Sequence, residues 1–291
     1  MLTKLVPWLF VAMWSTGYVG MKLGAPYAEP MTFLSIRFIA VLVLIVPAFY
    51  LMGVARLAWP DMLRALFIGA WLHGIYLGAV MWAIAQGMAA GIVALIITLQ
   101  PIVTSVAAWL FMGEVIRPRH WFGLVLGFAG VAIAVFPGLD LHAPIASPAA
   151  ILACMFALAA ITFATLYQKA FAADLDLRAS LIPQYVGAAL VVSVMALLTE
   201  SRDVTWTVEL IFAIAWLVIV LSIGAVSLLL ILLRHNAVWR TSALFYLVPP
   251  ITSVFAWLMF DEKLVPVQVA GMGVVVVAVW LTHSARLDAK S

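Results

Sequence analysis

Long apolar runs separated by short polar segments dominate this chain. Bounded by charges and turn residues, each run is close to the roughly 20 residues that an α-helix needs to cross a bilayer. The stretch between Arg64 and Glu114 holds no Asp, Glu, Lys or Arg and is too long for one helix, so we expect a hairpin that turns at QGMAAG, residues 86–91. The pattern therefore predicts ten transmembrane helices, at residues 5–22, 31–52, 62–85, 89–112, 119–136, 148–168, 179–199, 209–233, 238–260 and 264–284.

One of these helices is written twice. LQPIVTSVAAWLFMGE (residues 99–114) and LVPPITSVFAWLMFDE (residues 247–262) align without a gap, and an offset of 148 relates Pro101 to Pro249 and Glu114 to Glu262. This repeat divides the ten predicted helices into two halves of five. An odd number of helices in each half would insert the second half upside down, as in many secondary transporters. We therefore expect an all-α integral membrane protein of two five-helix inverted-topology repeats around a central cavity, at residues 1–137 and 148–291.

Composition excludes a soluble protein and several functions. The chain is 67% hydrophobic and 9% charged, against about 45–50% and about 25% in soluble domains. A single cysteine, Cys154, excludes an internal disulfide and a Cys-based metal cluster. The sequence lacks the basic runs with interleaved aromatic residues that are typical of nucleic-acid-binding proteins. The expected partners are a small-molecule substrate and the lipid bilayer, with no cofactor and no metal; a monomer is compatible with the sequence.

The distribution of Lys and Arg predicts the orientation. With both termini cytoplasmic, only Lys22, Arg202 and Lys263 fall outside, and Arg37 lies within the second predicted helix. The remaining basic residues then all fall inside, as the positive-inside rule favours: Lys4, Arg56, Arg64, Arg117, Arg119, Lys169, Arg178, Arg234, Arg240, Arg286 and Lys290. The N-terminal run reaches Gly20 without a small-residue cleavage site, so we interpret it as a retained helix in the cell (inner) membrane.

The repeated helix carries prolines near its predicted middle. Pro101, Pro249 and Pro250 each remove a backbone donor and free a carbonyl four residues earlier, at Ile97, Phe245 and Tyr246. A freed carbonyl at membrane depth needs a neighbour, water or a solute, so it tends to face a cavity. We expect these prolines to act as hinges; a kink tolerated by packing is the alternative.

The position of charged residues predicts the kind of solute. Every Asp and Glu falls in a predicted loop or at a helix end, which argues against a carboxylate proton relay or a multidrug-cation site. Basic groups near the core are few, and Arg37 is the candidate charge partner, although it could snorkel to the interface. A neutral or zwitterionic solute fits this inventory best.

Several polar and aromatic residues could line the cavity. His73 is the one ionisable group deep in a predicted span, and Tyr76 should share its helix face; a histidine bonded to a neighbouring helix is the alternative, and proton coupling through His73 stays open. Trp14 lies mid-helix, away from the usual interfacial belt. The remaining candidates are Thr98, Gln100, Thr162 and Tyr246, of which Thr162 could equally serve contact between helices.

Three segments together carry a family resemblance. WLFVAMWSTGYVGMKLG, MAAGIVALIITLQPIVTSVAAWLFMGE and NAVWRTSALFYLVPPITSVFAWLMFDEKL resemble the drug/metabolite transporter superfamily, EamA-type branch. MWST in the first helix also resembles aromatic amino-acid exporters of the YddG type, but Gln100 stands where an aromatic is expected there. The resemblance implies ten helices around a cavity and metabolite export by alternating access.

The expected function is export of small zwitterionic or neutral metabolites, amino acids above all and aromatic ones among them. The alternative within the same fold is a lipid or polyprenyl-phosphate flippase, or an exporter of other drug-like metabolites. An intramembrane enzyme is disfavoured because the chain has no HExxH, GxSxG or paired mid-membrane acids.

Overall fold

The computed structural model describes residues 2–88, 90–138, 147–260 and 264–283, and within them the regular elements are helices. Eight helical segments of these residues are long and apolar enough to cross a membrane, and α14 is a shorter apolar helix. In chain order the elements are α1 (Leu2–Gly24), η1 (Ala25–Tyr27), α2 (Pro30–Leu51), α3 (Trp59–Gly69), η2 (Ala70–Ile75), α4 (Tyr76–Ala85), α5 (Ala90–Ile97), α6 (Gln100–Met112), α7 (Pro118–Val135), η3 (Phe136–Gly138), α8 (Pro148–Phe171), α9 (Leu177–Thr199), α10 (Val208–Trp216), η4 (Leu217–Ala225), α11 (Val226–His235), α12 (Val238–Ala243), η5 (Leu244–Leu247), α13 (Val248–Phe260) and α14 (Pro266–His283).

Two long helices contain a π-helical segment. Elements α3, η2 and α4 run on as one helix, with η2 π-helical, and α10, η4 and α11 do the same with a π-helical η4. Shifted by 148 residues, η2 would cover 218–223, which lies inside η4. Such segments change the direction in which the following side chains point and often occur at functional sites.

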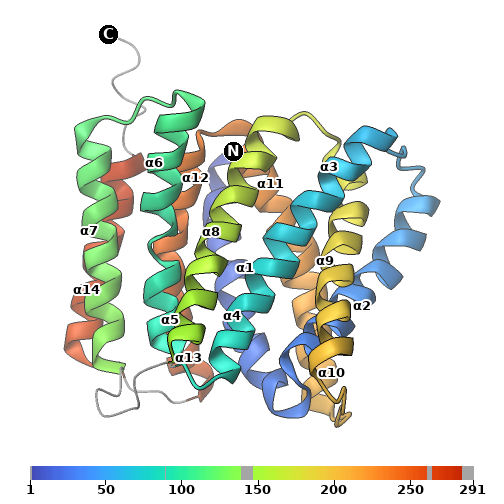
Figure 1. Cartoon of the computed structure of the whole chain (residues 1–291). Helices are drawn as coiled ribbons and strands as arrows, with labels where there is room; N and C mark the ends of the chain where they lie inside the picture. Colours follow the sequence, from blue (N-terminus) through green and yellow to red (C-terminus); the bar gives the residue numbers. More distant parts are fainter. Residues whose placement is uncertain (1, 89, 139–146, 261–263, 284–291) are drawn as a thin grey trace.

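The helices cross the bundle in alternating directions. Figure 1 shows α1 beginning and α14 ending at the same end of the bundle, the upper one in that view. Helix α8 begins at the opposite end. Consecutive helices of a multi-pass membrane protein run in alternating directions, because the chain crosses the bilayer back and forth. Each helix also satisfies its own backbone hydrogen bonds there.

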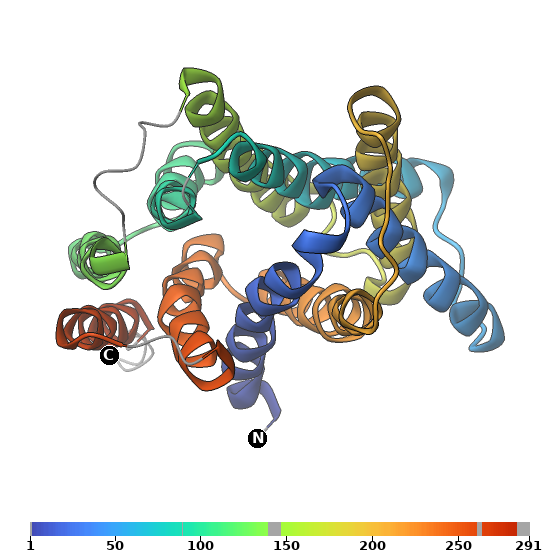
Figure 2. The same cartoon turned by 90° about the horizontal axis from the view of Figure 1, so that it is seen from below.

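Glycine permits the closest helix contacts. The pair α7 and α14 forms one end of the bundle and α2 lies at the other, beside α9 (Figure 2). A Cβ on Gly271 of α14 would lie 2.7 Å from the Gly130 carbonyl oxygen of α7. A Cβ on Gly187 of α9 would overlap the Leu66 carbonyl oxygen of α3, and one on Gly69 would overlap that of Gln184. Small residues therefore set the helix spacing.

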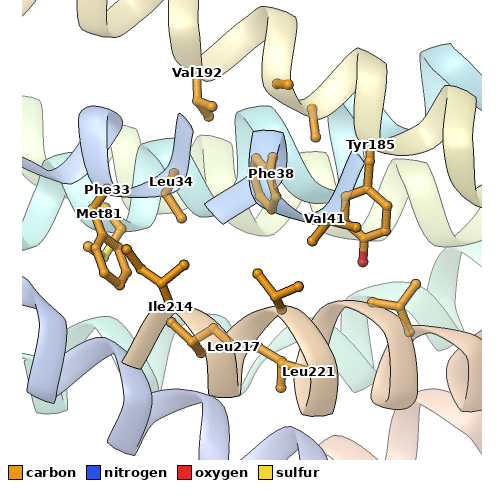
Figure 3. Close-up of a cluster of buried hydrophobic side chains, with 14 of the residues drawn as sticks. Phe33, Leu34, Phe38, Val41, Met81, Tyr185, Val192, Ile214, Leu217 and Leu221 are labelled. Carbon is orange, nitrogen blue, oxygen red and sulfur yellow. The ribbon is translucent and has the colours of Figure 1, made fainter. Parts of the chain in front are cut away.

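A large hydrophobic cluster fills the space between α2, α9, α10 and η4 (Figure 3). Phe33, Leu34 and Phe38 of α2 are fully buried, and Leu217 of η4 packs with them. Tyr185 projects from α9 toward η4 in the same cluster (Figure 3). This core fixes α2 and α9 against the π-helical segment.

Carboxylates outside the helices hold two helix N-termini. Glu200 accepts hydrogen bonds from the backbone of Met31 and Thr32, each at 2.7 Å, at the start of α2. Glu114 accepts one from Val238 N at 3.0 Å, at the start of α12. Both use the positive end of the helix dipole. Glu262, the counterpart of Glu114 in the sequence repeat, lies outside the described residues.

Candidate functional site

Both copies of the repeated helix are interrupted at their prolines. Helix α5 ends at Ile97, a turn at Thr98 and Leu99 follows, and α6 begins at Gln100 with Pro101 in its first turn. In the second copy the 3₁₀ turn η5 separates α12 from α13, whose second and third residues are Pro249 and Pro250. We call these two interruptions the proline breaks. Pro101 and Pro249 thus lie at the start of a helical segment, where proline is well tolerated.

The proline breaks differ from the expected kink in one respect. The Phe245 carbonyl, expected to be left free by Pro249, accepts a hydrogen bond from Val248 N within the 3₁₀ turn. This carbonyl is therefore satisfied by the backbone and does not need a solute. The tighter i→i+3 pairing of a 3₁₀ turn supplies the donor that proline removes from the α-helical pattern.

The same serine contact recurs at both breaks. Ser105 Oγ donates to the Pro101 carbonyl at 2.6 Å, and Ser253 Oγ donates to the Pro249 carbonyl at 3.0 Å. Such bonds to the carbonyl four residues earlier are associated with helix bending. An offset of 148 relates both the prolines and the serines.

Aromatic rings from two helices meet beside the second break. Trp14 of α1 lies 5.3 Å from Phe245, ring centre to ring centre, and Phe10 lies 5.4 Å from Phe245. Both Phe245 pairs are edge-to-face, the arrangement that ring quadrupoles favour. At the next position of α1, Ser15 Oγ donates to Val11 O at 2.7 Å and reaches Val248 O of the same break at 3.4 Å. The Trp14 side chain is half-buried.

Arg37 does not snorkel. It is 2% exposed, and its Nε donates to Ser222 Oγ of η4 at 3.1 Å. Tyr185 Oη of α9 donates to the Ser222 carbonyl oxygen, and its ring stacks on His73 of η2 with a centre distance of 5.3 Å. We call Arg37, His73, Tyr185 and Ser222 the Arg37 cluster. It joins both π-helical segments to α2 and α9.

His73 and Tyr76 have different neighbours. His73 lies among Tyr185 and Phe38, whereas Tyr76 packs in a separate cluster that includes Leu72 and residues of α8. The expectation that they share a helix face rested on α-helical spacing. The π-helical segment that ends at Ile75 adds a residue to that turn and separates them.

Several buried polar atoms in the described residues have no hydrogen-bond partner in the protein. Buried polar groups are nearly always paired, so each exception needs an explanation. Thr98 Oγ1 is satisfied, because it donates to Ala94 O at 2.5 Å. Among the expected site residues the exceptions are Arg37 Nη1, His73 Nε2, Gln100 Nε2, Thr162 Oγ1 and Tyr246 Oη. Thr104 Oγ1, one turn after Gln100 on α6, is another.

The structure does not gather all the expected residues at one point. Tyr246 belongs to the cluster around α1, η5 and α14, and Tyr76 to the one around α4 and α8. Trp14 packs against the first of these and also against the cluster between α2, α9 and η4. Arg37 and His73 lie in a third place, the Arg37 cluster, where α2, η2, α9 and η4 meet. Sequence reasoning missed Tyr185, Ser222 and Phe10, and for Phe245 it considered the carbonyl and not the ring. Tyr185 stands 148 residues after Arg37, so the repeat offset held a signal for it.

Known proteins give the fold and the family. A solved crystal structure superposes with a TM-score of 0.80 over 96% of both chains at 17% sequence identity, which shows the fold alone. A Bacillus subtilis (strain 168) protein named uncharacterized transporter YvbV is 24% identical over 97% of this chain and 92% of its own length. An Escherichia coli (strain K12) protein named uncharacterized inner membrane transporter YedA is 22% identical over 92% of this chain and 86% of its own.

A family model agrees over both halves of the chain. The model of the EamA-like transporter family matches residues 5–136 and again residues 148–284. The two matches together cover most of the 291 residues. The apolar helices indicate a membrane protein, and the relatives named above are transporters. The chain is a multi-pass membrane transporter and belongs to the EamA-like transporter family.

Proposed function

We propose that this transporter exports small zwitterionic or neutral metabolites, amino acids above all, across the inner membrane by alternating access. The observation that carries the proposal is the set of buried polar atoms without a protein partner, which includes Gln100 Nε2, Tyr246 Oη and Arg37 Nη1. Amide, hydroxyl and guanidinium groups can bind a carboxylate, and aromatic faces such as Trp14 can receive an ammonium. Gln100 and Tyr246 lie at the proline breaks, whereas Arg37 and Trp14 lie on the continuous helices α2 and α1.

Charge supports a solute without net charge. Arg37 is the charged residue that the described spans bury deepest, at 2% exposure, while the described Asp and Glu residues stand in loops or in first turns. A multiply anionic solute would need several cations, and a cationic one would need an intramembrane acid. A zwitterion needs one cation for its carboxylate and can place its ammonium on aromatic rings or carbonyl groups.

Alternating access requires two related halves, and we infer ten helices in two inverted repeats. Contacts support this: α1 packs on α13 and η4, and α8 packs on the corresponding α6 and η2. The paired π-helical segments, the paired Ser–Pro contacts and the double family match support it too. Rocking one half against the other around a fixed site is the motion such repeats allow.

Transport is tested with the purified full chain in liposomes preloaded with unlabelled amino acids. We expect counterflow of radiolabelled zwitterionic amino acids, and competition by an excess of the same unlabelled compound. Empty liposomes are the control. Absence of exchange across a broad panel of neutral and aromatic amino acids would contradict the amino-acid part of the proposal. Movement of a fluorescent lipid instead would favour the flippase alternative.

The orientation is tested separately. In a Cys154→Ala background, single cysteines replace Ala55, in the segment between α2 and α3, or Ser201, in the segment after α9; both positions are exposed. A membrane-impermeant maleimide should label the Ser201→Cys variant on intact cells, and the Ala55→Cys variant only after permeabilisation. The reverse labelling would place both termini outside.

A further inference from the structure

A continuous series of aromatic rings runs along the outer face of α3, η2 and α8. Phe67 lies 5.2 Å from Tyr167 and Trp71 lies 5.1 Å from Phe163, ring centre to ring centre. Tyr167 lies 4.8 Å from Phe171. Phe156, 6.1 Å from Trp71, completes the series. We call these six residues the aromatic ladder.

The aromatic ladder faces outward from the bundle. Phe163 is 42% exposed, Phe156 is 50% exposed and Phe171 is 57% exposed. Isolated exposed apolar residues are normal in a membrane protein, but six touching rings make a broad, flat apolar strip. Rings of this kind pack well against acyl chains, and the strip ends at Phe171, the last residue of α8.

A pocket of about 470 Å³ lies at that end of the ladder. Phe171 belongs to both, so the pocket continues the apolar strip. Its charged lining residues are Asp61, Arg64, Lys169 and Asp174. They carry two positive and two negative charges.

The four charged side chains of the pocket are exposed or half-buried, so a ligand can reach them. Arg64 Nη1 lies 3.1 Å from Asp61 Oδ1, and the two side chains are 47% and 32% exposed. An ion pair this exposed contributes little to stability, so a ligand can separate it at low cost. Lys169 Nζ donates to Leu233 O at 2.9 Å and so stays fixed at the pocket wall. A ligand can therefore replace water around both signs of charge.

We propose that the pocket and the aromatic ladder bind a phospholipid with an ethanolamine headgroup. The phosphate would lie at Arg64 and Lys169, the ammonium at Asp61 and Asp174, and an acyl chain along the ladder. Equal numbers of each charge match a zwitterion, whereas a purely anionic headgroup would meet the two carboxylates. A primary ammonium can donate hydrogen bonds to a carboxylate, and a trimethylammonium cannot.

The location fits a bilayer lipid. The C-terminal end of α8 and the start of α3 lie at the same end of the bundle in Figure 1, the end at which α1 begins. Under the topology proposed above, this is the cytoplasmic leaflet; only the choice of leaflet depends on that proposal. Headgroup pockets between helices at a membrane surface are a recurrent mode of lipid recognition.

Native mass spectrometry of the delipidated full-length protein tests the proposal. The probes are phosphatidylethanolamine, phosphatidylcholine and phosphatidylglycerol with identical acyl chains, offered in equal amounts. We expect preferential retention of the ethanolamine lipid. Equal retention of all three lipids, or a preference for phosphatidylglycerol, would overturn the proposal.

Variants separate the two parts of the site. Asp61→Asn combined with Asp174→Asn should lower ethanolamine binding about five-fold or more and remove its advantage over choline. Arg64→Gln should weaken all three lipids, and Phe163→Ala should weaken all three without changing their order. Arg56→Gln and Glu209→Gln, exposed charges outside the pocket, are the matched controls and should change nothing.

Two further outcomes would also overturn it. An unchanged ethanolamine preference in the doubly substituted variant would place the lipid elsewhere. A dimer that Phe163→Ala dissociates would make the aromatic ladder a protein–protein face. Because lipid retention is measured without transport, a protein that transports no amino acid can still bind the lipid, so the two proposals fail independently.

Discussion

The Arg37 cluster and the proline breaks are both polar regions inside an apolar bundle, but they are built differently. In the Arg37 cluster, side chains bond across helices: Arg37 donates to Ser222, and Tyr185 donates to the Ser222 carbonyl. At the proline breaks, Ser105 and Ser253 bond to their own helix, and among the described residues only the second break exchanges bonds with another helix, through Ser15 of α1. Gln100 Nε2 and Tyr246 Oη have no partner at the breaks, as Arg37 Nη1 and His73 Nε2 have none in the cluster. The first region mainly holds helices together and leaves Arg37 Nη1 for a solute carboxylate, and the second offers neutral polar groups to the solute.

This difference predicts two kinds of mutational effect. Changes to the groups that pack or bond around Arg37, such as Gly187 and Tyr185, should lower the free energy of unfolding, and transport should fall only with the amount of folded protein. Changes at the proline breaks should lower transport in protein that remains folded.

The largest effect is expected where α3 and α9 meet beside the Arg37 cluster. In Gly187→Val the new side chain would overlap the Leu66 carbonyl oxygen, and backbone cannot move aside cheaply. We expect a loss of about 3 kcal/mol or more, the upper range of overpacking, seen as a lower thermal unfolding temperature and loss of the monodisperse peak. Gly273→Val is the control, because nothing lies within 4 Å of a Cβ there. Equal stability of the two variants would show that α3 and α9 are not closely packed.

The next effect concerns motion at the proline breaks. Pro101→Ala, and Pro249→Ala combined with Pro250→Ala, should restore continuous helices and slow transport about ten-fold, equivalent to about 1.4 kcal/mol in the barrier, with thermal stability close to that of the unmodified protein. Pro47→Ala is the control, since Pro47 lies inside α2 and outside the repeated helix. Unchanged transport rates in both variants would leave these prolines a packing role only.

The sequence predicted one of these regions much better than the other. Proline acts locally, so the positions of the breaks follow from Pro101 and Pro249 themselves. The Arg37 cluster depends on Ser222, 185 residues away in the chain, and no local pattern announces such a partner. Nor does a sequence signal mark η2, whose AWLHGI contains no proline. This segment packs against α8 and α9, which lie far away in the sequence, and its π-helical form separates His73 from Tyr76.

Gln100 should show transport and stability moving in different directions. Gln100→Leu removes a buried amide whose Nε2 has no partner, and an unsatisfied buried group costs about 1–3 kcal/mol. We expect unchanged or higher thermal stability and weaker substrate binding in counterflow. Gln168→Leu is the comparison, because the buried Gln168 amide donates from Nε2 to Ala172 O at 3.2 Å and accepts at Oε1 from Gln184 Nε2 at 3.4 Å. That variant should be less stable, and a stability loss in Gln100→Leu as well would mean that Gln100 holds helices together.

The smallest and most direct contrast compares two tyrosines. Tyr185→Phe removes a buried hydroxyl that donates to the Ser222 carbonyl, and the lost hydrogen bond should cost about 1 kcal/mol of unfolding free energy. Tyr246→Phe removes a hydroxyl with no partner in the protein, from a ring that is 1% exposed. The ring still packs against Gly127 in that variant, so stability should stay the same or rise slightly.

Transport should separate the same two variants in the opposite sense. If Tyr246 Oη meets the solute, Tyr246→Phe raises the substrate concentration needed for half-maximal counterflow, while Tyr185→Phe leaves it unchanged per folded molecule. Thermal unfolding and counterflow on the same preparations check both halves of the contrast. Because each change deletes one oxygen atom and leaves the ring in place, packing differences cannot account for the result. A stability loss in Tyr246→Phe with normal transport would assign Tyr246 the same structural role as Tyr185, and the difference between the two regions would disappear.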